Sequence, residues 1–185
     1  MPVQLQRRLL TAAEYHTMIN VGIFTEDDRL ELLNGEIVCM SPVGDPHIGC
    51  VNWLNTMLNR KLAGQAIISV QNPIDVDTMS EPEPDIAICK LRDDFYRTKK
   101  AQSTDILLII EVADSSLAKD REVKLPLYAR AGIPVYWIVN LADKQIEVYH
   151  TPDEGIYKVR EIATLKDRVT LGSLGLELAV REVLG

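Results

Sequence analysis

Two carboxylates stand beside apolar segments, where an ionised side chain is costly to bury. Asp85 follows the prolines of EPEPDIAIC (residues 81–89), and Glu111 lies near the end of DILLIIEVA (residues 105–113). A buried ionised acid is normally paired, bound to a metal or protonated. Two close carboxylates repel each other, and a divalent cation makes both ionised forms tolerable. If the two segments are strands of one sheet, these hard oxygen donors predict a site for Mg²⁺ or Mn²⁺ rather than zinc.

Hydrolysis at such a site also needs a cation that orients water or stabilises developing negative charge. Lys124, in the segment after the second acid, is the candidate. Asp120 lies four residues earlier, on the same face of a helix, so the two could instead form a solvated surface pair of little energetic value. Because Pro126 disturbs this helix, Lys119 or Arg121 could turn toward the site in place of Lys124.

Each acid also has an ordinary structural interpretation. A carboxylate after a proline is commonly a turn or cap residue, which would explain Asp85. Glu111 could pair with a basic side chain such as Arg121. Both acids, together with the helix lysine, favour one shared metal site over these separate explanations.

The elements before the first acid can be read from turn and cap signals. Thr11 and Glu14 form a capping box for a short helix. Asn34-Gly35, between two apolar runs, predicts a hairpin because both positions tolerate positive φ. Residues 47–64 predict a helix that ends near Gly64, with apolar positions at helical spacing: Ile48, Val51, Leu54, Met57, Leu58 and Leu62.

The elements that carry the acids are predicted to be strands. Residues 66–78 and 84–89 favour two strands, and residues 105–113 a strand buried on both faces. Residues 114–132 predict a helix that starts at Ser115 or Ser116, stops at Gly132, and is kinked or restarts at Pro126. Residues 135–140 and 145–150 predict a hairpin, followed by a strand at 157–162. The segment 145–150 is a candidate edge of the sheet.

This order of elements predicts an α/β (α+β) fold in which helices flank a mixed central β-sheet. A length of 185 residues suits one domain over residues 1–185. The net charge of −7 counts against a protein that coats DNA, but not against local DNA contact. The basic run YRTKK (residues 96–100) could track a phosphate backbone or could simply be a soluble loop.

The cysteines and the N-terminal segment indicate in which cellular compartment the protein is expected. Cys39, Cys50 and Cys89 form no C-x-x-C pair, so they indicate reduced thiols rather than a disulfide framework or zinc knuckle. No run approaches the roughly 20 apolar residues that span a bilayer, and a signal peptide is not indicated. We therefore expect a cytoplasmic protein.

Several segments resemble the Uma-two family of bacterial endonucleases, a branch of the PD-(D/E)XK nuclease superfamily. They are RLELLNGEIVCMSP, EPEPDIAIC, IIEVADSSLAKDREVKLPLYARAGIPVYWIVN and IEVYH. The resemblance covers residues 10–180, and residues 110–140 are its most specific part. It implies a restriction endonuclease-like fold.

The resemblance also implies roles for individual residues. Pro84-Asp85 matches the PD dipeptide, and Glu111 the second acid. The superfamily lysine normally stands two residues after that acid, where this chain has Ala113; in similar members the lysine has moved to the next helix, which nominates Lys124. The first acidic position would be Glu31, with Glu36 less favoured. His47 matches a polar position of the family motif, whose role stays open.

The mechanism implied by the resemblance is metal-assisted hydrolysis of DNA phosphodiesters. Asp85, Glu111 and the backbone carbonyl of Val112 would hold Mg²⁺ or Mn²⁺. Lys124 would position the attacking water or neutralise charge, and Glu31 would complete the outer part of the site. A homodimer is expected, because enzymes that cut both strands often act as dimers. The alternatives are a non-catalytic scaffold or binding protein with this fold, and a phosphoesterase for a smaller substrate.

Overall fold

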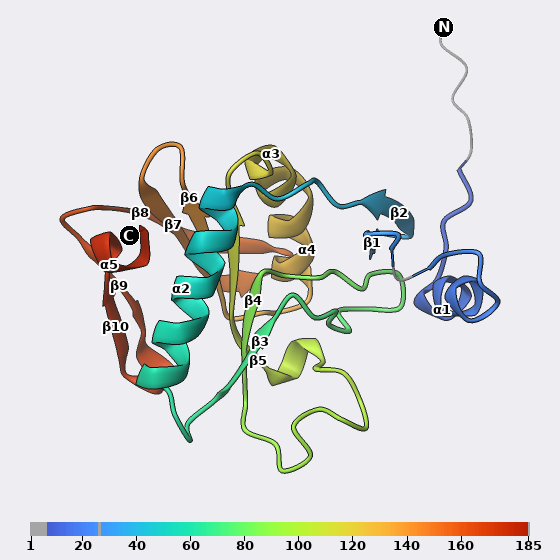
Figure 1. The fold of residues 1–185 in the computed structure, drawn as a ribbon, viewed down its shortest axis with the longest axis horizontal. Helices are drawn as coiled ribbons and strands as arrows, with labels where there is room; N and C mark the ends of the chain where they lie inside the picture. Colours follow the sequence, from blue (N-terminus) through green and yellow to red (C-terminus); the bar gives the residue numbers. More distant parts are fainter. Residues whose placement is uncertain (1–6, 26, 185) are drawn as a thin grey trace, which may run out of the picture.

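The computed structural model describes residues 7–25 and 27–184 (Figure 1). Helix α1 (Ala12–Asn20) lies at one side of the molecule, apart from the main sheet. The predicted capping box is present: the Glu14 backbone N–H donates to Thr11 Oγ1 over 3.2 Å, and the Thr11 N–H donates to Glu14 Oε2 over 2.9 Å. These two bonds satisfy backbone donors at the start of the helix.

The predicted hairpin is formed by β1 (Leu30–Leu33) and β2 (Glu36–Cys39). Its turn places Asn34 at φ 51° and Gly35 at φ 80°. A Cβ on Gly35 would stand 2.7 Å from Leu9 Cβ, so this position requires glycine for space as well as conformation. An isolated bridge between Leu32 and Glu81 ties the hairpin to the segment that leads into the first acid.

Helix α2 (Asp45–Lys61) follows, with Gly44 at its N-cap and a proline in its first turn. Its last residue is Lys61 and Leu62 is its C-cap, and Gly64 adopts φ 73° just beyond, close to the helix end that the sequence predicted. Five of the six apolar positions expected to face the core are buried. Ile48 is the exception, at 44% exposed, because it lies on the outer side of the first turn.

The central sheet has six strands in sequence order, namely β3 (Ile67–Val70), β4 (Ile86–Cys89), β5 (Ile106–Ala113), β6 (Val135–Asn140), β7 (Gln145–Asp153) and β8 (Ile156–Thr164). Only β5 and β6 are parallel, and every other neighbouring pair is antiparallel. The predicted α+β fold with a mixed central sheet is confirmed. Segment 145–150 is not an edge, because β7 pairs on both sides; the edges are β3 and β8.

The crossover from β5 to β6 contains the predicted helix in three pieces: α3 (Leu117–Lys119), a π-turn η2 (Asp120–Lys124) and α4 (Leu125–Arg130). Pro126 occupies the first turn of α4, so the helix restarts there rather than kinking. Since proline lacks an N–H, it cannot close the regular bond to the preceding turn, which favours the wider π-turn before it.

Several elements were not predicted. Strands β9 (Arg168–Leu171) and β10 (Leu176–Ala179) form a separate hairpin, and α5 (Val180–Leu184) follows it. The segment expected to be one strand over 66–78 ends as β3 at Val70. Short 3₁₀ turns, η1 (Ser103–Asp105) and η3 (Gly172–Leu174), complete the order.

Two hydrophobic clusters lie on opposite faces of the sheet. Alternate strand side chains pack against α2, α5 and the β9–β10 hairpin on one face, and against α4 on the other. Trp137 packs in the first cluster and Tyr136 in the second, both completely buried. Among the described residues, no helix is long and apolar enough to cross a membrane.

Candidate active site

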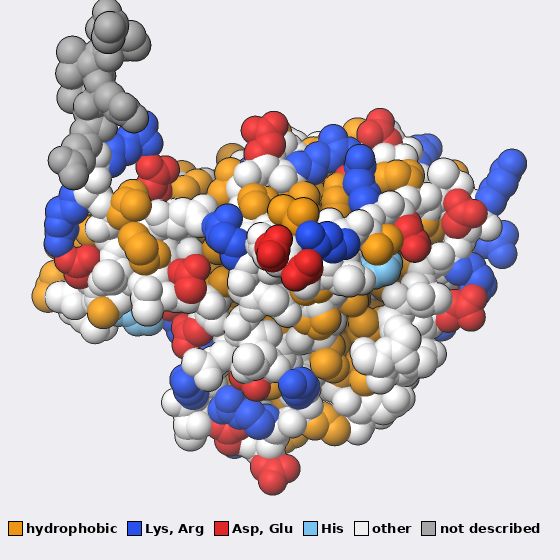
Figure 2. Space-filling view, turned by 180° about the vertical axis from the view of Figure 1, so that it is seen from behind, with side chains coloured by type: hydrophobic (Ala, Val, Ile, Leu, Met, Phe, Trp, Pro, Cys, Tyr) orange, Lys and Arg blue, Asp and Glu red, His pale blue; other side chains and the backbone are white. Residues whose placement is uncertain are grey.

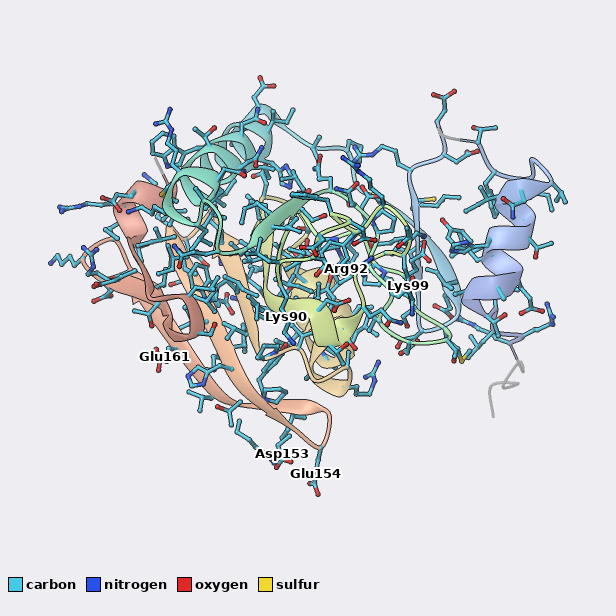
Figure 3. All side chains as sticks on the ribbon, turned by 90° about the horizontal axis from the view of Figure 1, so that it is seen from below. Lys90, Arg92, Lys99, Asp153, Glu154 and Glu161 are labelled. Carbon is cyan, nitrogen blue, oxygen red and sulfur yellow. The ribbon has the colours of Figure 1, made fainter. Side chains whose placement is uncertain are left out.

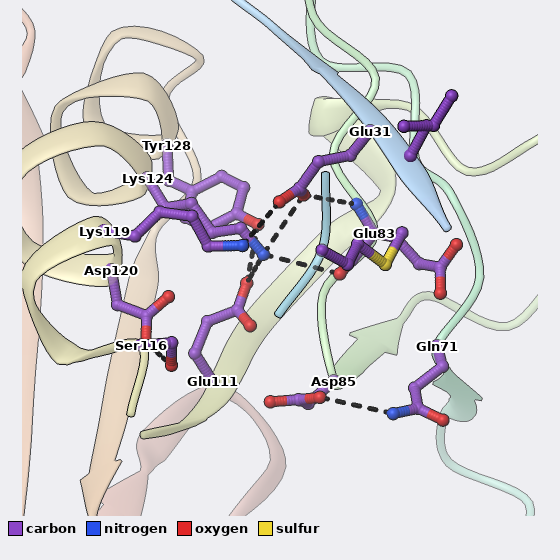
Figure 4. A network of polar contacts seen from close by, with 12 residues as sticks. Glu31, Gln71, Glu83, Asp85, Glu111, Ser116, Lys119, Asp120, Lys124 and Tyr128 are labelled. Atoms are coloured by element: carbon purple, nitrogen blue, oxygen red, sulfur yellow. Dashed lines mark hydrogen bonds and ion pairs between the residues drawn. The ribbon is translucent and has the colours of Figure 1, made fainter. Parts of the chain in front are cut away.

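Strand register brings the two predicted acids together. Ile86 pairs with Ile110 and Ala87 with Ile109, so one residue beyond the ladder Asp85 stands opposite Glu111. Directly opposed residues of antiparallel strands have Cβ atoms roughly 4.5–5.5 Å apart. Figure 4 shows both carboxylates facing the same space. The sequence therefore placed both acids correctly at neighbouring strand ends.

Asp85 is held by donors from three elements. The Val112 backbone N–H donates to Asp85 Oδ2 over 2.8 Å, and His47 Nε2 lies 3.0 Å from the same oxygen. Gln71 Nε2 is 3.5 Å from Oδ1. Burial opposes ionisation, but the hydrogen bonds from His47 and Val112 outweigh it and lower the pKa of Asp85. Asp85 is therefore an oriented carboxylate.

Glu111 is 4% exposed and binds through one oxygen. Its Oε1 accepts from Lys124 Nζ over 2.8 Å and from the Tyr128 hydroxyl over 3.0 Å. Within the described residues, Oε2 receives no hydrogen bond. Burial raises the pKa of Glu111 to about 8, and the nearby charges of Asp120 and Asp85 act in the same direction. The Oε2 oxygen without a hydrogen bond and the free-energy cost of burying the ionised Glu111 carboxylate both favour a cation as an additional partner.

Lys124 lies between two acids and is 3% exposed. Besides its bond to Glu111, its Nζ is 3.3 Å from Glu31 Oε2 and 3.4 Å from the Glu83 carbonyl oxygen. Burial disfavours its charge, but the surrounding carboxylates, Glu111 first, outweigh burial and raise the pKa of Lys124. The structure therefore holds Lys124 as a cation within the cluster (Figure 4).

The alternative of a solvated Lys124–Asp120 pair is wrong. Asp120 is 1% exposed, and no ion pair among the described residues joins it to Lys124. Its Oδ2 instead accepts from the Ser116 hydroxyl over 2.6 Å, so that serine, at the predicted helix start, binds a side chain rather than capping the backbone. Burial raises the pKa of Asp120.

Glu31 occupies the outer side of the cluster, on β1. Its Oε1 accepts from Lys119 Nζ over 2.8 Å, and the Glu83 N–H lies 3.3 Å from its Oε2. Burial opposes its ionisation, but Lys124 and Lys119 outweigh that and lower its pKa. Glu36, the other choice for this position, points outward and pairs with Arg7 at 2.7 Å.

The basic alternatives to Lys124 are separated by the fold. Among the described residues, Lys119 forms an ion pair with Glu31 and with no other acid of the cluster. Arg121 pairs with Glu147 on β7 rather than with Glu111. The interpretation of Arg121 as the structural partner of Glu111 is therefore wrong. The partner is Lys124 instead.

A cleft of about 60 Å³ opens onto these groups. Its walls include residues 40–44 before α2, and Asp114 to Ser116 after β5. A cavity of this size has room for an ion and a few waters. The described residues form no cluster of three or more His, Cys, Asp or Glu side chains arranged to hold a metal ion alone. Mg²⁺ keeps several waters and commonly binds through one or two carboxylates, so Asp85, Glu111 and a backbone carbonyl fit it.

Three features of the site were not predicted. Tyr128, Ser116 and Asp120 contribute polar groups inside the cluster. The spacing offered a signal, because Asp120, Lys124 and Tyr128 recur every four residues and therefore share one face of a helix. The apolar neighbours that bury this face come from other strands, which spacing within one segment does not reveal.

Comparisons with known proteins agree on family and fold. A family model described as "Uma2: Putative restriction endonuclease" matches residues 12–181. A crystal structure of a putative nuclease belonging to DUF820, from Anabaena variabilis ATCC 29413, is similar with a TM-score of 0.75 over 95% of this chain and 97% of that one. Its sequence identity of 14% means that it shows the fold alone.

A second solved structure, the type IIG restriction endonuclease BpuSI, gives a TM-score of 0.44 at 18% identity. It covers 78% of this chain but 16% of that chain, and the similarity is too low to support an argument. No curated protein matches. The family match spans nearly the whole sequence and includes both acids and the lysine, so the chain belongs to the Uma2 family of putative restriction endonucleases.

Proposed function

We propose that this protein is a metal-dependent endonuclease that hydrolyses phosphodiester bonds in DNA. One observation carries the proposal: Asp85 stands opposite Glu111 at adjacent strand ends, with buried Lys124 bonded to Glu111. Such a group of charges is expensive in a fold and is characteristic of sites that perform chemistry. Membership of a nuclease family supports the same reaction class.

Asp85, Glu111 and the Val112 carbonyl would hold the ion, either Mg²⁺ or Mn²⁺. A bound ion of this kind polarises the scissile phosphate and lowers the pKa of a bound water. His47 and the Val112 N–H fix the Asp85 carboxylate in one orientation. Tyr128 does the same for Glu111 through Oε1 and leaves Oε2 open to the cleft.

Lys124 supplies the positive charge inside the cleft. Its Nζ can donate to the attacking water or to a phosphate oxygen on which negative charge develops. Glu31 holds that ammonium from the outer side, at 3.3 Å, while Lys119 compensates the charge of Glu31. Lys119 is 23% exposed, so it also adds positive charge at the mouth, where the substrate phosphate arrives.

The proposal is tested by cleavage of plasmid and oligonucleotide DNA with Mg²⁺, with Mn²⁺ and with a chelator. Wild type should cut only with an ion present. Asp85→Asn and Glu111→Gln should lose activity by a factor on the order of 10² or more while keeping the fold. Glu122→Gln, an exposed acid on η2, is the matched control and should cut normally.

Other outcomes identify the alternatives. A scaffold or binding protein would cut no DNA, and its DNA binding would be indifferent to both acids. A phosphoesterase for small substrates would hydrolyse a simple phosphodiester but no DNA. Either result would overturn the endonuclease proposal.

We extend the proposal to the assembly and its location: one domain over residues 1–185, acting as a homodimer in the cytoplasm. Two-fold symmetry is the common arrangement of soluble homo-oligomers and suits cleavage of both strands. Sedimentation velocity with and without duplex DNA measures the oligomeric state, and a monomer under both conditions would contradict the dimer.

A further inference from the structure

The connection between β4 and η1 is the most basic part of a chain whose net charge is −7. Residues 90–100, called the basic loop here, carry a net charge of +3, with two acids and five basic residues: Lys90, Arg92, Arg97, Lys99 and Lys100. Figure 2 shows Lys and Arg side chains gathered at the lower end of the molecule, where Figure 1 places this loop. Figure 3 shows Lys90, Arg92 and Lys99 close to one another.

The basic loop presents an aromatic side chain to solvent. Phe95 is 63% exposed, and Phe95 and Tyr96 adopt positive φ angles of 50° and 60°. Two consecutive bulky residues in this conformation cost free energy and need support from their surroundings. An apolar ring held outward at such a cost is a reason to look for a partner.

Asp94 supplies that support. Its carboxylate accepts from the Arg92 guanidinium at 2.6 Å through two nitrogens, from the Tyr96 N–H at 3.2 Å, and from the Thr98 N–H at 3.3 Å and hydroxyl at 2.5 Å. Arg92 also lies over the Tyr96 ring, 4.2 Å from its centroid. The loop is therefore a fixed structure that carries Phe95 at its outside.

A groove lies between the basic loop and the edge strand β3. It has a volume of about 450 Å³, and its lining includes Ile67, Ser69 and Asn72 from the edge, and Phe95 and Tyr96 from the loop. Asn72, in the lining of the groove, follows Gln71, whose Nε2 is 3.5 Å from Asp85 Oδ1. Strand β4 separates Asp85 from Lys90, a distance of roughly 17 Å at about 3.3 Å per residue.

We propose that this groove and the basic loop bind a single strand of nucleic acid that leads away from the active site. Phe95 would stack on an unpaired base, and Arg97 and Lys99 would contact phosphates. The inference rests on the proposed nuclease function and adds the substrate class: an unpaired strand extends from the scissile bond along β3.

A single strand fits this surface better than a duplex does. Stacking on a protein aromatic ring requires a base whose face is free, and bases inside a duplex already stack on each other. Aromatic rings combined with a positively charged groove are the usual means of binding single strands.

Fluorescence anisotropy with a labelled oligothymidylate tests the proposal. Binding is measured in a chelator, so that no ion-dependent cleavage occurs. Phe95→Ala and Phe95→Leu should both weaken binding about fivefold or more, because stacking on an aromatic side chain is lost. Phe95→Trp should keep or improve it. Ile156→Ala, at another exposed apolar residue (55% exposed) on β8, should change nothing.

The phosphate contacts are tested by salt dependence. Arg97→Ala/Lys99→Ala removes two exposed charges, so the slope of log affinity against log salt should fall by about 1.4. Lys166→Ala/Arg181→Ala removes two exposed charges elsewhere and is the matched control. A duplex of the same length should bind more weakly than the single strand and should be indifferent to Phe95→Ala.

Three results would overturn the inference. The first is oligonucleotide binding that is equal for wild type, Phe95→Ala and Phe95→Leu. The second is a preference for duplex. The third is salt-sensitive self-association that Arg97→Ala/Lys99→Ala abolishes, which would make the acidic tip of the β7–β8 hairpin, with Asp153 and Glu154 in Figure 3, the partner of the loop.

These experiments distinguish failure of the proposed single-strand binding from failure of the proposed nuclease function. Cleavage that is abolished by Asp85→Asn but insensitive to Phe95→Ala, with no binding at the loop, rejects the groove alone. Oligonucleotide binding that depends on Phe95 without any cleavage rejects the nuclease reaction and retains the binding surface.

Discussion

Lys124 is a buried cation that serves two carboxylates. Glu111 and Glu31 both contact its ammonium, so removal of Lys124 leaves two buried acids with too little positive charge nearby. Removal of one partner from a buried ion pair commonly costs about 3–5 kcal/mol. Lys124 therefore contributes to stability as well as to the proposed chemistry.

We predict that Lys124→Met abolishes DNA cleavage and lowers the free energy of unfolding by roughly 3–5 kcal/mol. Urea denaturation and a cleavage assay on folded protein measure the two effects. Lys119→Met is the control: it removes one contact to Glu31 from a partly exposed side chain, and it should destabilise less and leave measurable cleavage. Full activity in Lys124→Met with loss in Lys119→Met would assign the catalytic lysine role to Lys119.

Residue types alone predicted part of this site. Asp85 and Glu111 were identifiable because an acid at the end of an apolar run needs an explanation, and the structure brings both to one cleft. Their direct opposition was not predictable, because it depends on the register of β4 against β5. Asp120 was misread because periodicity gives the face of a helix but not what covers that face.

At the scale of elements, the crossover after β5 determines where the cations point. The π-turn η2 places Lys124 toward β5 and Arg121 toward β7, although the two residues are only three apart. A regular helix would bring residues three apart to neighbouring positions on one face. The turn therefore separates the catalytic candidate from the structural arginine.

Glu147 is the buried acid to which Arg121 binds. It is completely buried on β7 and accepts hydrogen bonds from Arg121, Arg160 and the Tyr149 hydroxyl. Burial opposes its charge, but the bonds from Arg121 and Tyr149 outweigh it and lower the pKa of Glu147 below the usual 4.5. A lowered folded pKa means that the charge stabilises the fold above about pH 4.5, and that this stability is lost as pH falls through the folded pKa.

We predict that Glu147→Gln lowers the free energy of unfolding by roughly 1–3 kcal/mol at neutral pH, a range limited by the solvent exposure of both arginines. The difference from wild type should shrink in acid, once the folded pKa is passed. Chemical denaturation across pH measures it, with the exposed Glu161→Gln as control. A difference independent of pH would show that shape rather than charge matters at this position.

Local signals predicted the elements that have strong local causes. The capping box at Thr11, the Asn34-Gly35 turn and the apolar run of β5 each depend on neighbouring residues. The edge position of β3 and the β9–β10 hairpin were missed because they depend on contacts between distant segments. Pro126 predicted where the helix is interrupted, but not that a π-turn precedes the interruption.

For the whole molecule, binding of the proposed divalent ion would be linked to folding. An ion that binds only the folded site stabilises it by about 2.7 kcal/mol at a concentration of 100 times Kd. For a chain of this size that corresponds to a rise in Tm of several degrees.

We predict that saturating Mg²⁺ or Mn²⁺ raises the Tm of wild type and leaves that of Asp85→Asn unchanged. Differential scanning calorimetry measures the shift, and Asp93→Asn, an exposed acid of the basic loop, should respond as wild type does. Equal shifts in wild type and Asp85→Asn would place the ion elsewhere on the molecule.

The central sheet also separates the two acids from the basic loop. The acids lie at one end of β4 and the basic loop follows its other end, and edge strand β3 runs alongside β4. From the sequence, the basic run of residues 96–100 could either track a phosphate backbone or be a soluble loop, because neither the exposure of Phe95 nor the groove beside it is visible without the fold.

The central claim is that Asp85 and Glu111 hold a divalent ion, and the most direct measurement is an anomalous difference map of crystals soaked in Mn²⁺. We predict one strong peak in the cleft, within about 2.0–2.3 Å of a carboxylate oxygen of Asp85 and of Glu111, and near the Val112 carbonyl. The peak should vanish in Asp85→Asn. A cleft without a peak at saturating Mn²⁺, or a peak that persists in Asp85→Asn, would contradict the claim.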